Sequence, residues 1–159
     1  MESCPYPIAE LLPHSGRMVL LDAVRGFSDS VIEADLCVRR GNPFFEAGRG
    51  VAAHIAIEWM AQACGAFVGL EARRQKQPVR VGFLLGTRNF SAERPWFREG
   101  EALVVRAELV FRDGETGVFD CTLRNGDVVA RAQLTLHQPS DLAAVLISQG
   151  IDVTMLDKR

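Results

Sequence analysis

The feature of this sequence that most constrains its fold is a long apolar segment at residues 51–74. The segment is rich in alanine, contains no proline and is long enough for about six turns of α-helix. Its apolar residues cover nearly every face as far as Leu70, and only His54, Glu58 and Gln62 interrupt them. Because a helix that is apolar all round is normally buried, the pattern predicts a buried helix over residues 51–72.

The segments on both sides of this helix have the patterns of β-strands. Before it, residues 32–39 alternate between inward and outward positions, as in a strand with one buried face, and residues 17–27 are rich in aliphatic side chains. The strands predicted after the helix are residues 79–90, 101–112, 117–124 and 128–136. Turn signals at Asp113-Gly114 and Asn125-Gly126 predict hairpins between the last three strands. Since one helix cannot cover both faces of a sheet, we expect an α+β fold in which an antiparallel sheet curls around the helix.

The remaining segments are less regular. Residues 7–12 are predicted to form a short helix, residues 41–50 an irregular loop, and residues 140–149 a short helical piece in the tail. Within residues 101–112, the alternation assigns Phe111 to the buried face of the strand.

Length and composition indicate one domain, residues 1–159, with a core over about residues 7–137 and a tail over residues 138–159. A net charge of −2 argues against general nucleic-acid binding, which needs a basic surface. The chain shows neither the start of a signal peptide nor an apolar run that could span a membrane, so we expect a cytoplasmic location. The cysteines have no metal-ligand spacing and no metal site is expected. Those within apolar stretches are predicted to be reduced and buried: Cys37, Cys64 and Cys121.

Short motifs occur in a defined order along the chain. They are residues 11–14 (Leu-Leu-Pro-His), 18–22 (Met-Val-Leu-Leu-Asp), 42–45 (Asn-Pro-Phe-Phe), 58–63 (Glu-Trp-Met-Ala-Gln-Ala) and 88–90 (Arg-Asn-Phe), followed by Pro95, Gly100 and Glu101. Together they resemble the 3-hydroxyacyl-[acyl carrier protein] dehydratases of the hotdog superfamily. The helix motif, with His54 before it, is most similar to the divergent dehydratase-like proteins of aryl polyene clusters. The resemblance implies a hotdog fold and the dehydration of a 3-hydroxyacyl thioester to a 2-enoyl thioester.

One motif of those dehydratases is missing from the loop before the helix. The family has its catalytic histidine directly after the Phe-Phe pair, but here that position falls at Phe44 or Phe45. The catalytic carboxylate of the family's helix is matched by Glu58. His54 lies four residues earlier and therefore shares a helix face with Glu58. We predict that His54 has taken over the role of the missing histidine, with Glu58 as its catalytic partner.

The resemblance also implies substrate-binding residues and partners. The predicted substrate-binding set is Phe44, Phe45, Gly50, Trp59 and Gln62, with Gly50 as the amide donor to the thioester oxygen and the aromatic rings along an acyl tunnel. The substrate would be carried on the phosphopantetheine of acyl carrier protein, and no other cofactor is expected. Family sites lie at a dimer interface, which implies a homodimer or higher oligomer, or a heterodimer with another hotdog subunit. The arginines that are candidates for contact with the acidic carrier protein are Arg17, Arg39, Arg40, Arg88, Arg94 and Arg98.

Several alternatives stay open at the level of sequence. Glu58 and Gln62 could hydrogen-bond to loop backbone, His54 could be a satisfied interface histidine, and the aromatic residues could simply pack in the core. The arginines could form a solvated surface. A hotdog acyl thioesterase would need only a helix carboxylate to activate water, and a non-catalytic acyl-binding or partner subunit would need neither residue. The fold alone does not choose among these functions.

Overall fold

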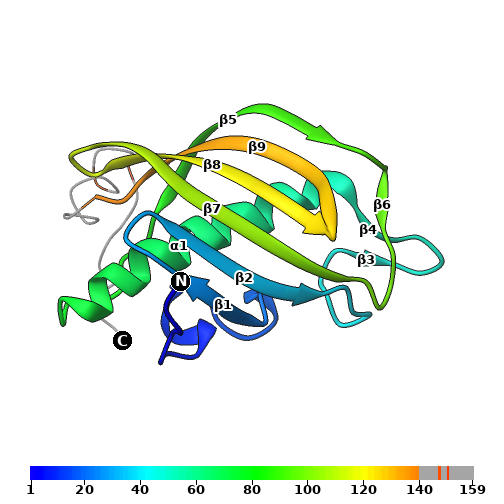
Figure 1. Ribbon diagram of the computed structural model, residues 1–159, viewed down its shortest axis with the longest axis horizontal. Coiled ribbons are helices and arrows are strands. Elements are labelled where there is room, and N and C mark those ends of the chain that lie inside the picture. Colours follow the sequence, from blue (N-terminus) through cyan, green and yellow to red (C-terminus); the bar gives the residue numbers. More distant parts are fainter. Residues whose placement is uncertain (140–146, 148–149, 151–159) are drawn as a thin grey trace.

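The chain has the predicted α+β architecture in a computed structural model, which describes residues 1–139, 147 and 150 (Figure 1). The larger sheet has six antiparallel strands in the order β1-β2-β7-β8-β9-β5, and a smaller sheet has the order β3-β4-β6. The strands are β1 (Ala23–Phe27), β2 (Val31–Cys37), β3 (Phe45–Glu46), β4 (Gly50–Ala52), β5 (Phe83–Ala92), β6 (Trp96–Phe97), β7 (Ala102–Asp113), β8 (Thr116–Asn125) and β9 (Asp127–His137). Helix α1 is Ala56–Arg74, and short 3₁₀ turns are Ile8–Glu10, Gly16–Met18 and Ala53–Ile55.

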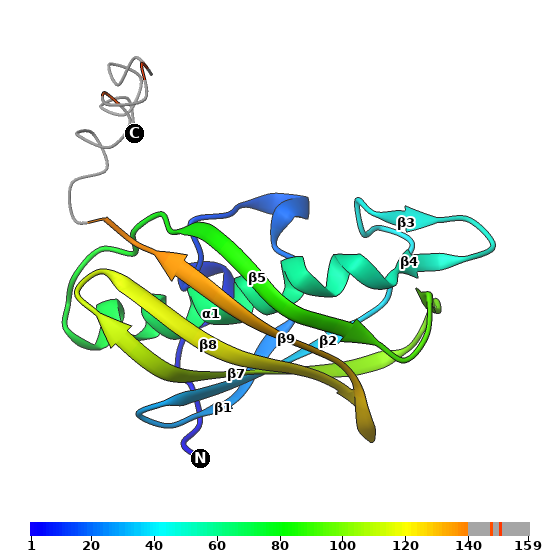
Figure 2. The same cartoon turned by 90° about the horizontal axis from the view of Figure 1, so that it is seen from above.

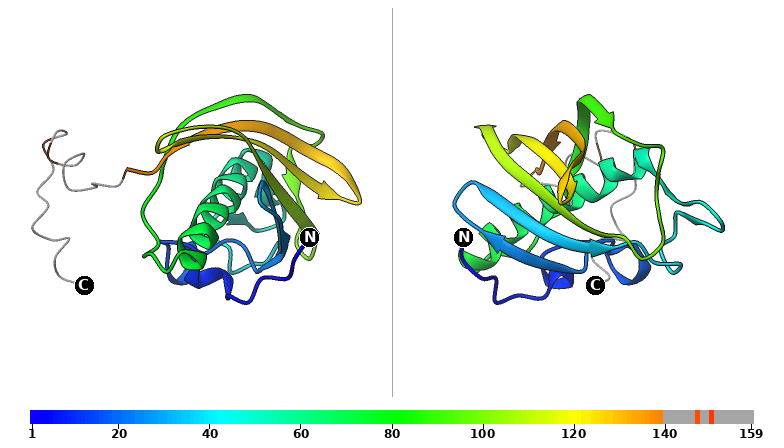
Figure 3. Two further views of the ribbon diagram at one scale, coloured as in Figure 1. Left: turned by 60° about the vertical axis from the view of Figure 1, so that its left-hand side comes forward. Right: turned by 45° about the vertical axis from the view of Figure 1, so that its right-hand side comes forward.

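The larger sheet curls around α1, which lies along its concave side (Figures 2 and 3). The predicted alternation is confirmed in the strands that contact the helix. Side chains at every second position of these strands are buried, as in Ile32, Ala34 and Leu36 of β2 and Phe119 and Leu123 of β8. This packing gives one hydrophobic core between the helix and the sheet.

Helix α1 begins later than the sequence predicts. Val51 belongs to β4 and pairs with Phe97 of β6, and the N–H of Ala53 donates to the carbonyl oxygen of Pro95 at 2.9 Å. Helical propensity is equally high at both ends of this alanine-rich segment. Propensity alone therefore does not show that residues 51–53 use their backbone groups to pair with the β6 segment instead of forming helix. The start predicted at residue 51 is therefore wrong by five residues, and α1 begins at Ala56.

We had predicted that the helix is buried on every face, but one of its faces is open. Trp59, Met60 and Ala63 are fully buried against the sheet. Glu58, by contrast, is exposed, and the neighbouring Ala61 is only partly buried. The prediction is wrong because the sheet covers one side of the helix, while apolar composition does not tell a covered face from an open one.

Strand boundaries differ from the predicted ones where strands are short or end in turns. The segment predicted as a strand over residues 17–27 begins with a 3₁₀ turn, and only Ala23–Phe27 is strand. The strand predicted over residues 79–90 is shifted to Phe83–Ala92. The loop predicted over residues 41–50 contains β3 and the start of β4, whose lengths are too short to show a periodicity.

Phe111 does not face the core as predicted, because the pairing of β7 with β8 shifts register between Leu109 and Phe111. A bulge adds one residue to one strand and so reverses the side to which the following side chains point. Phe111 is accordingly 61% exposed. Both predicted hairpins are present, with Gly114 and Gly126 at their turns in the left-handed region (φ of 60° and 72°).

Strand β5 forms an open edge of the larger sheet. Within the described part of the chain it pairs with β9 alone. Its side chains are exposed along nearly its whole length, and Leu85 is 61% exposed. Exposed apolar edge strands favour pairing with another chain.

The cysteines follow the prediction only in part. All four are free thiols: Cys64 and Cys121 are buried with their sulfur atoms 3.6 Å apart, and burial raises the pKa of the Cys64 thiol. Cys37 is only partly buried, because it occupies a polar position in the alternation of β2.

The described residues contain no helix that combines the length and the hydropathy needed to cross a bilayer. The helical piece predicted over residues 140–149 lies outside the described residues, except for Ile147. The predicted division into core and tail stays a prediction.

Candidate functional site

The smaller sheet holds the backbone that leads into α1. Gly50 in β4 has a φ of 104°, and a Cβ at this position would overlap the carbonyl oxygen of Phe97. Only glycine combines this left-handed conformation with so close an approach of two backbones. The close backbone contact is therefore sufficient to explain why position 50 is a glycine. The role of Gly50 as an amide donor to a substrate stays a prediction.

His54 and Glu58 lie one turn apart where α1 begins. His54 is in the 3₁₀ turn Ala53–Ile55 and Glu58 is in the first turn of α1. Both side chains are exposed, and within the described residues neither makes a hydrogen bond or an ion pair, to each other or to any other residue. The expectation that these groups sit inside an apolar element is wrong for the single chain, since both point from the uncovered face of the helix.

A groove begins at Glu58 and continues along that uncovered face. It has a volume of about 370 Å³. On the helix side it is lined by Glu58, Ala61, Gly65, Val68 and Ala72. These positions are three or four residues apart, so they form one stripe along the helix. We call this cavity the α1 groove.

The opposite wall of the α1 groove comes from the sheet. Its lining includes Phe119 of β8, Leu136 of β9 and Leu84 of β5. Leu84 and Leu136 are register partners and therefore stand side by side on the inner face of the sheet. The middle of the α1 groove thus offers small side chains on one wall and apolar side chains on the other.

The end of the α1 groove farthest from Glu58 is polar. Glu71 of α1 accepts two hydrogen bonds from Arg112 of β7, at 2.7 and 3.2 Å. Gln75 and Thr116 line the same end. Glu71 lies 13 residues after Glu58, which corresponds to about 20 Å along the helix axis.

Gln62 is a buried residue with both ends of its amide in use. Its oxygen accepts from the N–H of Leu20 at 2.9 Å, and its nitrogen donates to the carbonyl oxygen of Met18 at 2.6 Å. Buried polar groups are normally satisfied in this way. The side chain ties α1 to the segment before β1, which is the structural role that the sequence left as an alternative, although Gln62 also lines the α1 groove.

The predicted aromatic binding residues lie in different surroundings. Trp59 is fully buried and packs against Phe97, with ring centroids 5.4 Å apart, and its indole N–H has no partner within the described residues. Phe44 and Phe45 are partly buried and pack against the core. None of the three lines the α1 groove of the single chain, and their role toward a substrate stays a prediction.

The six candidate arginines divide into those that are engaged within the chain and those that are not. The engaged ones are Arg17 with the carbonyl oxygen of Gly41 (3.2 Å), Arg39 with Asp22 (2.6 Å), Arg40 with Glu99 (2.5 Å) and Arg94 with Glu101. Arg88 and Arg98 are exposed, and their guanidinium groups make no hydrogen bond or ion pair within the described residues. The charge of Arg17 is also not balanced by a carboxylate, because its partner is a neutral carbonyl oxygen.

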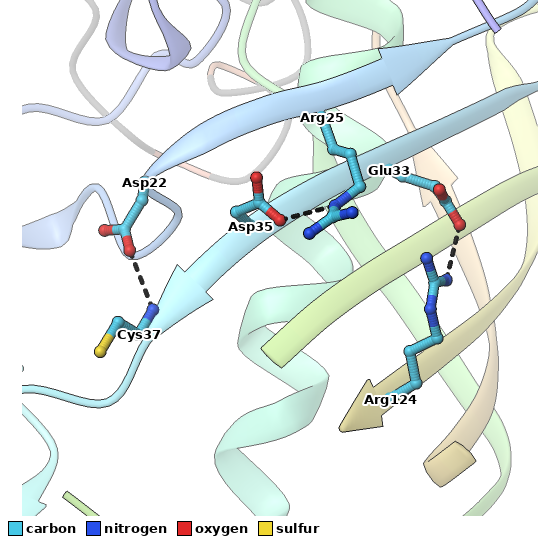
Figure 4. A network of polar contacts seen from close by, with 6 residues as sticks. All are labelled: Asp22, Arg25, Glu33, Asp35, Cys37 and Arg124. Carbon is cyan, nitrogen blue, oxygen red and sulfur yellow. Dashed lines mark hydrogen bonds and ion pairs between the residues drawn. The ribbon is translucent and has the colours of Figure 1, made fainter. Parts of the chain in front are cut away.

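A polar network covers the outer face of the sheet, away from α1 (Figure 4). Arg124 of β8 donates to Glu33 of β2 at 2.6 Å, and Arg25 donates to Asp35 at 2.8 Å. Glu33 is only 7% exposed. The hydrogen bond from Arg124 lowers the pKa of Glu33 and outweighs burial, which acts in the opposite direction. The strand alternation places Glu33 on this face but does not predict its burial, because the covering arginines come from other strands.

The α1 groove itself was not predicted from the sequence. Of the two glycines in the middle of α1, Gly65 lines the open groove. Gly69 allows a close approach by the backbone of Leu11. His14 also lines the groove. The spacing of Glu58, Ala61 and Gly65 was the available signal for such a stripe.

Solved structures with this arrangement define the class of protein. A hypothetical thioesterase from Streptococcus pneumoniae TIGR4, solved with coenzyme A, is 14% identical with a TM-score of 0.56, and the match covers 73% of this chain and 84% of that one. The uncharacterized protein PH1136 from Pyrococcus horikoshii is 13% identical with a TM-score of 0.63, covering 87% and 98% of the two chains. At these identities the likeness shows the fold alone, and the chain is a hotdog-fold protein.

Two further comparisons identify the family. The chain matches the ApeP-like family, described as ApeP dehydratase, over residues 6–147. It is 29% identical to a chain of the dehydratase heterocomplex ApeI:P from Xenorhabdus doucetiae, with a TM-score of 0.84, and the match covers 91% of this chain and 98% of that one. No curated protein sequence matches the chain. The chain belongs to the ApeP-like dehydratase family, and its enzyme class is that of a dehydratase, a lyase.

Proposed function

We propose that this protein dehydrates a 3-hydroxyacyl group, carried as a thioester on acyl carrier protein, during the biosynthesis of a polyene. The observation that carries the proposal is Glu58, an exposed carboxylate without a partner in the described chain, at one end of a groove long enough for an acyl chain. A cytoplasmic location is part of this proposal.

The reaction removes a proton from C2 and the hydroxyl group from C3, and water leaves as the C2–C3 double bond forms. One group must accept the C2 proton, and one must protonate the departing hydroxyl. An amide N–H that binds the thioester oxygen stabilises the negative charge that develops there. We assign the proton transfers to His54 and Glu58 and the amide to Gly50. This chemistry requires no cofactor besides the phosphopantetheine that carries the substrate.

We further propose that the site is completed by a second hotdog subunit. The uncovered face of α1 and the open edge of β5 both support this, because apolar side chains are only partly buried on the first and are exposed on the second in the single chain. The related chain from Xenorhabdus doucetiae belongs to a dehydratase heterocomplex. By analogy, the partner of this chain is a different dehydratase subunit, and a second copy of this chain is the alternative.

The decisive experiment is an assay that follows products by mass. The protein, alone and together with a co-expressed hotdog partner, is incubated with 3-hydroxyacyl and with saturated acyl carrier-protein thioesters. Loss of the mass of water from the hydroxyacyl substrate is the expected result. Release of free acid from either substrate would instead show a thioesterase, and no turnover of either, with or without the partner, would support a non-catalytic subunit.

A further inference from the structure

Gly65 lies in the middle of α1, where glycine is among the least favourable of helix residues. A glycine at such a position normally has a packing reason. Gly69, one turn later, has one, since a Cβ there would overlap the carbonyl oxygen of Leu11. The two glycines therefore permit a direct comparison within one helix.

The fold does not need a glycine at position 65. A Cβ built there would meet only the Cδ2 atom of Leu12, at 3.5 Å, which is an ordinary van der Waals contact. The backbone of Gly65 is helical, so alanine would cause no strain. Packing within the chain therefore explains why position 69 is a glycine, but it does not explain why position 65 is one.

The missing side chain does widen the α1 groove. Gly65 lines this groove between Ala61 and Val68, and Phe119 and Leu136 line the opposite wall. An occupant of this middle part therefore meets carbon atoms on both sides, which suits an apolar chain rather than a polar group.

The distance from Glu58 suggests which part of an acyl group would pass Gly65. The two residues are seven positions apart, or about 10 Å along the helix. Since three extended backbone bonds span about 3.6 Å, this distance corresponds to about nine bonds of an extended chain. An acyl group that reacts beside Glu58 reaches Gly65 only if it is long.

We propose that Gly65 is a specificity-determining residue, which keeps the α1 groove wide enough for the distal part of a long acyl chain. The proposal rests on the proposed function, because it takes Glu58 as the reacting end of the groove. According to this proposal, the residue at position 65 of α1 determines whether the protein binds long acyl chains as well as short ones.

Equilibrium binding of saturated acyl pantetheine thioesters tests this directly, because it does not depend on turnover. Tetradecanoyl and butanoyl pantetheine are titrated into the full-length chain, with its hotdog partner where one co-purifies, and into Gly65→Ala and Gly65→Val. Gly65→Ala is expected to raise Kd for the long thioester by about tenfold, Gly65→Val by more, and neither to change Kd for the short one. At the same time Gly65→Ala should raise Tm by about 2–4 °C, because alanine is the better helix former.

Two control variants accompany the titrations. Gly41→Ala adds the same methyl group in a loop with open space around it and should change neither Kd nor Tm. Gly69→Ala should lower Tm, in contrast to Gly65→Ala, because it forces the Leu11 backbone to move.

The proposal is overturned if the wild type does not bind the long thioester, or if both variants at Gly65 bind long and short thioesters as the wild type does. A change in oligomeric mass in Gly65→Ala, measured by light scattering, would also overturn it, since Gly65 would then serve a subunit contact. Binding with the expected pattern but no dehydration would refute the proposed function and leave the role of Gly65 standing.

Discussion

At the scale of single residues, the site depends on which polar groups at the start of α1, and in the 3₁₀ turn before it, already have hydrogen-bond partners. Gln62 is buried and its amide is used by the backbone of Met18 and Leu20. Glu58 and His54 are open to solvent and make no such contacts within the described residues. Of the three polar residues in this segment, the two that are free to act on a substrate are therefore the two that the sequence proposed as catalytic.

Substitution of Glu58 by glutamine tests the catalytic assignment. The change should lower kcat for dehydration by about 10²–10⁴-fold, the usual contribution of a general acid or base. Because the side chain is exposed, Tm should stay unchanged. His54→Ala should have an effect of the same order in a thioester dehydration assay.

Asp29→Asn removes an exposed carboxylate in the turn between β1 and β2, outside the α1 groove, and serves as the matched control. Full activity in both Glu58→Gln and His54→Ala would remove these residues from the mechanism.

The ion pair of Glu33 and Arg124 predicts a pH dependence of stability. The hydrogen bond from Arg124 lowers the pKa of Glu33 in the folded chain. A carboxyl group with a lowered pKa stabilises the fold above its unfolded-state pKa, about 4.3, and this stabilisation is lost as the pH falls through the folded-state pKa. We expect Glu33→Gln to lower the free energy of unfolding by about 2 kcal/mol at pH 7, and this deficit should shrink progressively as the pH falls below the unfolded-state pKa of about 4.3.

Urea unfolding of the wild type and the variant between pH 3 and pH 7 measures this difference. Glu99→Gln is the control, since Glu99 pairs with Arg40 on an exposed surface and should contribute little. A deficit of Glu33→Gln that is the same at every pH would show that the ionised pair is not its cause.

At the scale of elements, β5 and α1 each keep an uncovered side in the part of the chain that the structure describes. Strand β5 has one paired side and one open side, and the α1 groove opens on the same part of the molecule, since Leu84 of β5 is one of its lining residues. A partner that pairs with β5 would therefore also lie near the groove.

Leu85→Asp should weaken assembly with the partner subunit. Leu85 is 61% exposed on β5, and a charge on an edge strand disfavours its pairing with another chain. We expect the mass measured by light scattering to fall toward that of one chain, 17.5 kDa. Phe111→Asp is the matched control, because Phe111 is equally exposed but lies on β7. Loss of assembly in Phe111→Asp and not in Leu85→Asp would move the interface away from β5.

At the scale of the whole molecule, the net charge of −2 does not show which arginines are paired within the chain and which are free. Three of the six candidates are paired with carboxylates within the chain, and Arg17 is held only by a carbonyl oxygen. Arg88 and Arg98 make no hydrogen bond or ion pair through their guanidinium groups in the described residues, so they are the first candidates for a docking surface for an acidic partner. Glu101, which binds Arg94, also accepts from the N–H of Arg98, so the loop that carries Arg98 is anchored while its guanidinium stays free.

The double substitution Arg88→Glu and Arg98→Glu should raise Kd for acyl carrier protein by about 2- to 30-fold, and the effect should shrink in high salt. Titration of carrier protein at low and high ionic strength measures it. The double substitution Arg39→Gln and Arg40→Gln, which removes charges that are already paired, should have a smaller effect. Equal effects of the two pairs, or none, would show that the free arginines do not form the docking surface.

The sequence by itself determined the order of the elements, the inward alternation of β2, β8 and β9 and both hairpins. These features depend on side chains close together in the chain, where periodicity and turn chemistry act directly. Motif order also indicated the hotdog fold and the dehydratase family.

Only the tertiary structure decided the start of α1, the uncovered face of that helix, the outward position of Phe111 and the pairing of Arg39 and Arg40. The helix start depends on β6, and the two arginines depend on Asp22 and Glu99, all of which are distant in sequence. Phe111 points outward because of a bulge in the pairing of β7 with β8, which the alternation of β7 alone does not reveal. The α1 groove belongs to the same group, because it is formed by a helix and four strands that meet only after folding. The residues proposed for catalysis could therefore be named from the sequence, whereas the space in which they would act could not.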